Sequence, residues 1–207
     1  MRSGAWQRIE LPGADLSLSQ LFDPAEAQRW FERLQAEIPW EQHHIRLFGR
    51  QVPTPRLSCW LGDADAVYTY SGMRYEPHAW TVRLAELRTA VCILCAQSYN
   101  SALCNLYRDG RDAMGWHSDD EPELGPAPSI ASLSLGAMRR FRLCHREDPA
   151  KKLSIDLQPG SVLLMAGATQ RNYRHELPRT ARAVGARINV TFRTILVDAA
   201  RPLASRS

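Results

Sequence analysis

The stretch Ile130-Ala131-Ser132-Leu133-Ser134-Leu135 alternates apolar and small polar residues. A β-strand with one buried face has this two-residue period, because successive side chains point to opposite sides of the sheet. Further segments of strand length follow one another from residue 101 onward, separated by turn signals and without helices between them. The strand candidates are residues 102–107, 114–118, 129–136, 140–145, 153–157, 161–165 and 187–196. Short strands at this spacing predict a sandwich or a jelly roll.

The first hundred residues have a different pattern, which predicts two amphipathic helices. Asp23 and Pro24 are typical of a helix start, and apolar residues at helical spacing extend this helix over residues 24–38. Residues 79–98 show a second apolar helix face. The C-x-x-C match at residues 92–95 lies inside that face, with no second cysteine pair nearby, so we interpret it as helix core rather than as a metal site.

The composition is that of an ordinary globular protein. With 207 residues, of which 44% are apolar and 23% charged, the chain is long enough for one well-filled core. No apolar run reaches the ~20 residues of a membrane span, and the N-terminus has no stretch of signal-peptide type. The five cysteines are an odd set, mostly within apolar segments, which predicts reduced thiols and a cytoplasmic protein. We expect a monomer that does not associate with membranes.

The distribution of charge is uneven along the chain. From Arg139 onward there are 14 Lys and Arg against 5 Asp and Glu, whereas the first 138 residues hold 12 against 17. A cationic surface attracts the phosphates of a polyanion, so this asymmetry is typical of a nucleic-acid partner. The alternative is that the arginines are scattered over solvated faces.

Three residues form a candidate metal site. His117 and Asp119 would share one face of an extended backbone, since they are two residues apart. With a third ligand they would match the 2-His-1-carboxylate arrangement of iron(II) oxygenases. His175 is the best candidate, because it follows an apolar strand and a later strand could bring it across the barrel. A solvated polar loop is the alternative interpretation of the His-x-Asp pair.

A strand near the end of the chain offers groups for a co-substrate. Arg187, Asn189 and Arg193 are separated by even numbers, so all three would point to one face of the strand at residues 187–196. An iron site of this type has open positions for an oxidant and a co-substrate, and a dicarboxylate is held best by a planar arginine. Burying three polar side chains would destabilise the fold by several kcal/mol unless a ligand or partner formed hydrogen bonds with them. The alternative is a strand whose polar face is solvated.

These motifs together resemble the AlkB family of iron(II)- and 2-oxoglutarate-dependent dioxygenases. The matching motifs are Asn105-x-Tyr107, His117-x-Asp119, His175 and Arg187-x-Asn189-x-x-x-Arg193, in the order of the family and within residues 45–196. Residues 47–50, 68–72 and 117–121 are most similar to the animal branch that repairs double-stranded DNA. The resemblance implies an α+β, mainly β fold: a double-stranded β-helix (jelly roll) with supporting N-terminal helices. We expect one domain over residues 1–207, with helices and substrate-recognition loops in 1–100 and the catalytic core in 101–196.

The resemblance implies a role for each matching residue. The residues implied to bind iron(II) are His117, Asp119 and His175. Those implied to hold 2-oxoglutarate are Asn105, Tyr107, Arg187, Asn189 and Arg193, with the two arginines at its two carboxylates. Those implied to contact the substrate are Phe48, Arg56, Tyr68, Tyr70, Asp120 and Glu121.

The implied substrate contacts are those of an enzyme that flips a base out of a duplex. Phe48 resembles the wedge that fills the gap left by the base, and Tyr70 the aromatic residue that stacks it against His117. Arg56, Asp120 and Glu121 would position the base, and Tyr68 is a neighbour. Tyr70 stands where the animal branch has a phenylalanine, a departure that bears on base preference.

The activity implied is oxidative demethylation of 1-methyladenine and 3-methylcytosine in DNA, using O2 and 2-oxoglutarate and releasing formaldehyde, succinate and CO2. Both bases are cationic, so Asp120 and Glu121 would favour them over normal bases. The target atoms lie on the Watson–Crick edge, which a duplex hides, so the base must be flipped. The alternatives are an RNA demethylase, a protein or small-molecule hydroxylase on the same fold, and a non-enzymatic nucleic-acid-binding jelly roll with a structural metal.

Overall fold

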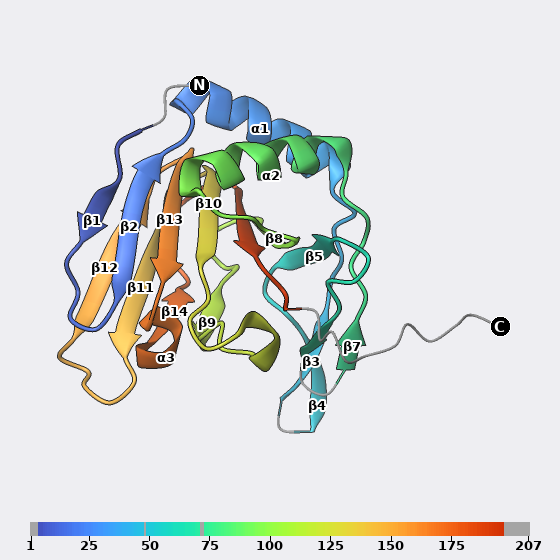
Figure 1. The fold of residues 1–207 in the computed structure, drawn as a ribbon. Helices are drawn as coiled ribbons and strands as arrows, with labels where there is room; N and C mark the ends of the chain where they lie inside the picture. Colours follow the sequence, from blue (N-terminus) through green and yellow to red (C-terminus); the bar gives the residue numbers. More distant parts are fainter. Residues whose placement is uncertain (1–3, 48, 71–72, 197–207) are drawn as a thin grey trace.

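The computed structural model of the protein describes residues 4–47, 49–70 and 73–196, with side chains for all of these except residues 46–47, 68–70 and 73–75. Two antiparallel sheets contain most of its strands (Figure 1). No helix in the described part of the chain is long and apolar enough to cross a bilayer.

The larger sheet has seven strands in the order β1-β2-β13-β10-β15-β8-β5. These strands are β1 (Gln7–Ile9), β2 (Asp15–Gln20), β5 (Leu57–Gly62), β8 (Ser101–Tyr107), β10 (Ile130–Gly136), β13 (Ser161–Ala166) and β15 (Arg187–Arg193). In the register of the central strands, Asn189 lies opposite Ser134 on one side and Asn105 on the other. Residues opposite one another in an antiparallel pair share a face, so this row places polar side chains on one face of the sheet.

The smaller sheet has four strands in the order β12-β11-β14-β9. They are β9 (Met114–His117), β11 (Arg139–His145), β12 (Lys152–Leu157) and β14 (Tyr173–Leu177). His175 of β14 lies directly opposite His117 of β9. The pairing of these two strands therefore brings together two histidines that are far apart in the sequence.

Two helices lie side by side against the large sheet (Figure 1). They are α1 (Pro24–Glu37) and α2 (Val82–Cys95). Asp23 caps α1 by accepting a hydrogen bond from the Glu26 N–H at 2.8 Å, which confirms the predicted helix start. Helix α2 is shorter than the predicted 79–98, because Thr81 caps its N-terminus and Ala96 adopts a left-handed conformation at its end.

The two faces of β15 have opposite characters. Ile188, Val190 and Phe192 are fully buried in the core that joins the sheet to the two helices. The alternate residues of this strand, including Arg187 and Arg193, line a cavity between the two sheets. The predicted two-residue division of this strand is confirmed, and its polar face is covered rather than solvated.

The remaining elements are short. The hairpins β3 (His44–Leu47) with β4 (Arg50–Pro53), and β6 (Tyr68–Tyr70) with β7 (Met73–Tyr75), lie outside the two sheets. In the view of Figure 1, β3, β4 and β7 extend away from the two helices. A 3₁₀ turn, η1 (Pro122–Leu124), and a short helix, α3 (Thr169–Asn172), complete the described chain.

The turn between β12 and β13 requires a glycine. Gly160 has φ +81°, and a Cβ at this position would lie 2.4 Å from the carbonyl oxygen of Phe22. A side chain is therefore excluded both by conformation and by space. Residues 158–161 therefore form one of the turns expected between the predicted strands.

The jelly roll extends beyond the segment expected to form it. Strands β1, β2 and β5 come from the first hundred residues and join the large sheet, so the sheet is not confined to residues 101–196. Strand β14 was missing from the predicted strands. Its inward residues include His175 and its outward residues include Arg174 and Glu176, so polar side chains on both faces hide the hydrophobic period.

All five cysteines are free thiols. Cys92 and Cys95 lie in α2 and pack in the core between the helices and the large sheet, which confirms their interpretation as helix core.

Candidate active site

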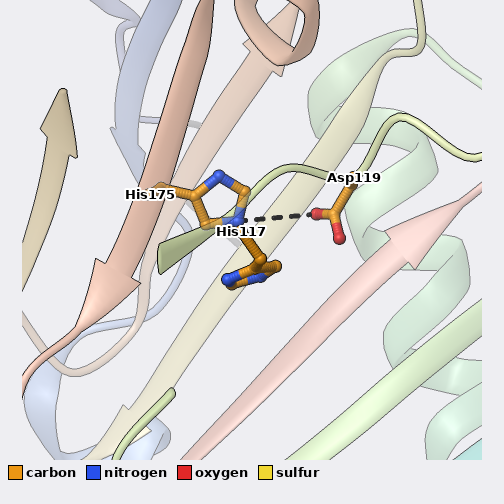
Figure 2. A group of neighbouring side chains, drawn as sticks. All are labelled: His117, Asp119 and His175. Carbon is orange, nitrogen blue, oxygen red and sulfur yellow. Dashed lines mark ion pairs between the residues drawn. The ribbon is translucent and has the colours of Figure 1, made fainter. Parts of the chain in front are cut away.

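His117, Asp119 and His175 form a compact cluster between the sheets (Figure 2). Their potential ligand atoms all lie within 4.8 Å of one another, and the Nε2 atom of His175 is 3.7 Å from Oδ2 of Asp119. The two imidazole rings meet edge to face, with centroids 4.1 Å apart. Among the described residues no other three His, Cys, Asp or Glu side chains come together in this way. Two histidines and one carboxylate on one side of a metal match the iron(II) arrangement.

Neighbouring backbone and side chains hold this cluster in place. The Nδ1 atom of His117 is 2.8 Å from the carbonyl oxygen of Gly115. Because a carbonyl oxygen only accepts, Nδ1 carries the proton and Nε2 keeps its lone pair for a metal. On the next residue, the Ser118 hydroxyl donates to the Tyr173 carbonyl at 2.8 Å, which ties the loop after β9 to β14.

The charges around the cluster favour ligand forms that bind a metal. Burial alone would raise the pKa of Asp119, but Arg193 and the two histidines reverse this effect, so the pKa lies below its usual range. Burial, His117 and Arg193 lower the pKa of His175 to about 3, against the opposing influence of Asp119. At neutral pH the carboxyl group is therefore ionised and the His175 imidazole is neutral, as metal ligands must be.

A cavity beside the cluster is lined by the expected co-substrate residues. Asn105, Tyr107, Arg187, Asn189 and Arg193 all lie on its wall, together with the three residues of the cluster. The residues on β8 and β15 reach this wall because of their two-residue period and their pairing across the sheet.

Arg187 is a buried cation with spare hydrogen-bonding capacity. Its side chain is only 2% exposed, its Nη2 donates to the Ser134 hydroxyl at 2.9 Å, and its Nε has no partner among the described residues. Burial lowers the pKa of Arg187 to about 10, with Arg139 adding to the shift and Tyr107 opposing it. The guanidinium remains charged at neutral pH, and a buried charge of this kind calls for an anionic ligand.

Arg193 and Asn189 have protein partners as well as a place on the cavity wall. Arg193 donates from Nη2 to Oδ1 of Asp119 at 2.6 Å, while its Nε has no partner among the described residues. Asn189 donates to the Ser132 hydroxyl at 2.8 Å. Arg193 therefore supports the carboxylate of the metal cluster, a contact that the sequence did not indicate.

Three of the residues predicted to contact the substrate, Arg56, Asp120 and Glu121, have described side chains that differ in their partners and exposure. Arg56 donates from Nε to the amide oxygen of Asn105 at 2.8 Å, so it contacts the cavity wall directly. Asp120 is half exposed and forms an ion pair with Arg146. Glu121 is partly buried in the segment that follows Asp119.

The three aromatic residues predicted to contact the substrate cannot be placed in the same way. Phe48 lies outside the described residues, and so do the side chains of Tyr68 and Tyr70. Their roles as wedge, neighbour and stacking partner stay predictions.

Sequence reasoning missed three residues that organise the site. Ser132 and Ser134 hold Asn189 and Arg187 in place. The alternation in residues 130–135 puts both serines on one face, and that period is the signal that could have identified them. Gln170 accepts a hydrogen bond from the Asp119 backbone N–H at 3.0 Å and is 1% exposed. It lies in α3 with no sequence motif to mark it.

Replacing Gln170 tests whether its hydrogen bond to the Asp119 backbone keeps the Asp119 carboxylate in position for the metal. We expect Gln170→Met to weaken iron(II) binding by about 10–100-fold, the usual effect of losing an outer partner of a metal ligand. Titration of iron(II) into the metal-free protein measures this. Gln97→Met, at an exposed position, is the matched control. Unchanged affinity in Gln170→Met would show that the loop holds Asp119 without this bond.

Comparisons with known proteins agree with this geometry. The model of the 2OG-Fe(II) oxygenase superfamily matches residues 15–193. The chain is 34% identical over 206 residues to the DNA oxidative demethylase ALKBH2 of Mus musculus, covering 95% of this chain and 86% of that protein. It is 38% identical over 185 residues to the alpha-ketoglutarate-dependent dioxygenase alkB homolog 3 of Rattus norvegicus, covering 85% of this chain and 62% of that protein.

A solved structure has the same fold. The structure of OsALKBH1 superposes with a TM-score of 0.66 at 17% sequence identity, covering 92% of this chain and all of that one. The mainly β jelly-roll architecture is therefore confirmed.

Proposed function

Because the chain belongs to the AlkB family of 2OG-Fe(II) oxygenases, we propose that it repairs N-alkylated bases in DNA by oxidative demethylation. It is an iron(II)- and 2-oxoglutarate-dependent dioxygenase. The proposed substrates are 1-methyladenine and 3-methylcytosine, and the proposed products are the restored base, formaldehyde, succinate and CO2. The observation that carries the proposal is the buried His-Asp-His cluster beside an arginine that has no anionic partner among the described residues.

The donor set fits both groups that the reaction needs. We assign iron(II) to His117, Asp119 and His175, with Oδ2 of Asp119 as the ligand atom because Oδ1 accepts from Arg193. We assign one carboxylate of 2-oxoglutarate to Arg187, because its buried Nε has no hydrogen-bond acceptor among the described residues. We assign the second carboxylate of 2-oxoglutarate to Arg193, which lies on the wall of the same cavity. Burial raises the pKa of Tyr107, so its hydroxyl stays protonated and can donate to the same co-substrate; Asn105 and Asn189 complete the contacts.

Iron(II), 2-oxoglutarate and O2, when bound, supply the oxidation of the N-methyl group. The chain's own residues orient these groups and exclude water: Asp119 and His175 are only 3% and 4% exposed. The hydroxymethyl group left on the base nitrogen then leaves as formaldehyde, which restores the base.

Selection of the damaged base combines flipping and charge. A methyl group on the Watson–Crick edge blocks pairing, so the damaged base leaves the duplex more easily than a normal one. The positive charge of the methylated base favours carboxylates near the site. Asp120 already pairs with Arg146, so we expect Asp120 to contribute less to this preference than its position in the sequence indicated.

DNA is the proposed nucleic acid, with RNA as the alternative. Relatives 34% and 35% identical to the chain are named DNA oxidative demethylases, and the second half of the chain is rich in arginine. The cytoplasmic location and the monomeric state stay predictions.

One assay tests the function. The protein is incubated with iron(II), 2-oxoglutarate and an oligonucleotide carrying 1-methyladenine or 3-methylcytosine, and the product is weighed by mass spectrometry. We expect loss of the methyl group together with succinate release. DNA and RNA, each single- and double-stranded, form the four arms. Retention of the methyl group in every arm despite succinate release would overturn the repair function and favour a hydroxylase of another substrate.

A further inference from the structure

A second cavity lies on the outer face of the small sheet, away from the co-substrate cavity. We call it the outer groove; it has a volume of about 520 Å³. Its lining includes Trp116, Arg140, Arg142, Lys152, Ser154 and Arg179. These side chains come to one face because exposed and buried residues alternate along β11, where Arg140 and Arg142 point outward and Phe141 points inward.

The outer groove carries more positive than negative charge. Two of its cations have acidic partners: Arg140 pairs with Asp156 at 2.9 Å, and Arg142 pairs with Glu176 at 2.9 Å. Lys152 and Arg179 form no ion pair with any residue in the described ranges. Two cations without partners on one groove attract an anionic ligand.

An exposed aromatic ring lies in the same groove. Trp116 is 40% exposed, although tryptophan side chains are usually well buried. The guanidinium of Arg142 lies 5.4 Å from the centroid of its ring, which stiffens the indole against the sheet. A flat ring beside cations offers a stacking surface for a base next to contacts for phosphates, which is how proteins bind single-stranded nucleic acids.

The position of Trp116 connects the groove to the active site. It precedes His117 on β9, so the indole and the imidazole point to opposite faces of the same strand. Strand β9 is at the edge of the small sheet. A nucleic-acid strand with one base in the active site can therefore pass around this edge and reach the outer groove.

We infer that the outer groove binds a second segment of the strand whose target base enters the active site. Phosphates contact Lys152 and Arg179, and a base stacks on Trp116. This inference rests on the proposed function, and it names a substrate contact outside the site of chemistry. An acidic peptide would use the two cations but has no base for the ring, so the repeating phosphates and bases of a nucleic acid fit the groove better.

Length-dependent binding tests the cationic part of the groove. The affinity of the full-length protein for undamaged single-stranded DNA of 5 and 15 nucleotides is measured by fluorescence anisotropy. We expect Lys152→Glu/Arg179→Glu to weaken binding of the 15-mer at least 10-fold and of the 5-mer less than twofold. Loss of two phosphate contacts should also reduce the salt dependence, the slope of log K against log salt, by about 1.4. The control is Arg29→Glu, a charge reversal on the exposed side of α1.

Stacking is tested separately. We expect Trp116→Ala to weaken binding of the 15-mer at least 5-fold, the effect of losing one stacked base, and Trp116→Phe to restore most of it. On an abasic 15-mer the three proteins should bind equally. Equal losses on normal and abasic strands, or competition by polyglutamate as strong as by DNA, would overturn the stacking contact in favour of a general anion site.

Failure of the outer groove and failure of the proposed function give different experimental results. If the wild-type protein demethylates oligonucleotides but Lys152→Glu/Arg179→Glu binds the 15-mer as tightly, only the outer groove is refuted. If the wild-type protein neither binds nor demethylates any oligonucleotide, the proposed function itself is refuted.

Discussion

The variant His117→Ala should lose more than about 100-fold of the demethylation rate and should no longer retain iron(II). Loss of an outer partner of a metal ligand already weakens a site by about 10–100-fold, and His117 is one of the three described residues to which we assign the metal. Its side chain is half-buried at the end of β9, so removing the ring leaves the packed core intact. Iron content per chain and succinate release are measured in parallel.

The control for this variant is His78→Ala. His78 is exposed and pairs with Glu41 outside the cavity, so loss of an imidazole there should leave iron content unchanged. Wild-type turnover or full iron retention in His117→Ala would refute the metal assignment. A melting temperature close to wild type separates loss of the metal site from loss of the fold.

Arg187→Met should give a protein that is more stable and does not use 2-oxoglutarate. Burial lowers the pKa of the Arg187 guanidinium to about 10 in the folded chain, well below its value in the unfolded chain. This shift opposes folding by roughly 3 kcal/mol at any pH where the side chain is charged in both states. The penalty is fully present below pH 10 and decreases as the pH rises through the folded-state pKa toward that of the unfolded chain. After loss of the bond to Ser134, a net gain of about 1–2 kcal/mol should raise the melting temperature by about 2–8 °C.

The same substitution removes the cation assigned to the co-substrate. Loss of one partner of a buried charge pair costs about 2 kcal/mol or more, so 2-oxoglutarate should bind at least about 30-fold more weakly. Added 2-oxoglutarate should raise the melting temperature of the wild-type protein but not that of the variant. Arg182→Met, at an exposed position, should change neither property. A melting temperature below wild type, with co-substrate binding intact, would contradict both expectations.

The sequence period was enough to predict the cavity face of the last strand. Arg187, Asn189 and Arg193 are two or four residues apart, and the structure places all three on the wall that also holds the metal cluster. The His-x-Asp spacing worked for the same reason, because it depends only on local backbone geometry. Residues 15–20 and 57–62 were harder to assign to the core, since joining the sheet depends on partners that are at least 39 residues away in the sequence.

Some contacts between distant elements had no signal in the sequence. Gln170 of α3 contacts the backbone of Asp119, and Arg146 pairs with Asp120, across more than 20 residues of sequence in each case. Strand β14 stayed hidden because its inward-facing His175 is polar. For Gln170 and Arg146 the missing information is a tertiary contact, whereas for β14 it is the weak local hydrophobic period.

The order of strands in the large sheet has a consequence for how the protein is made. Strand β15, the last of the described strands to be synthesised, lies inside the sheet between β10 and β8. Until it is inserted, the edges of both neighbours are unpaired and prone to associate with other chains. A chain that stops before residue 187 should therefore fail to show a cooperative melting transition. Synthesis must pass residue 193 before the large sheet can be completed, so the nascent chain has unpaired strand edges until that point.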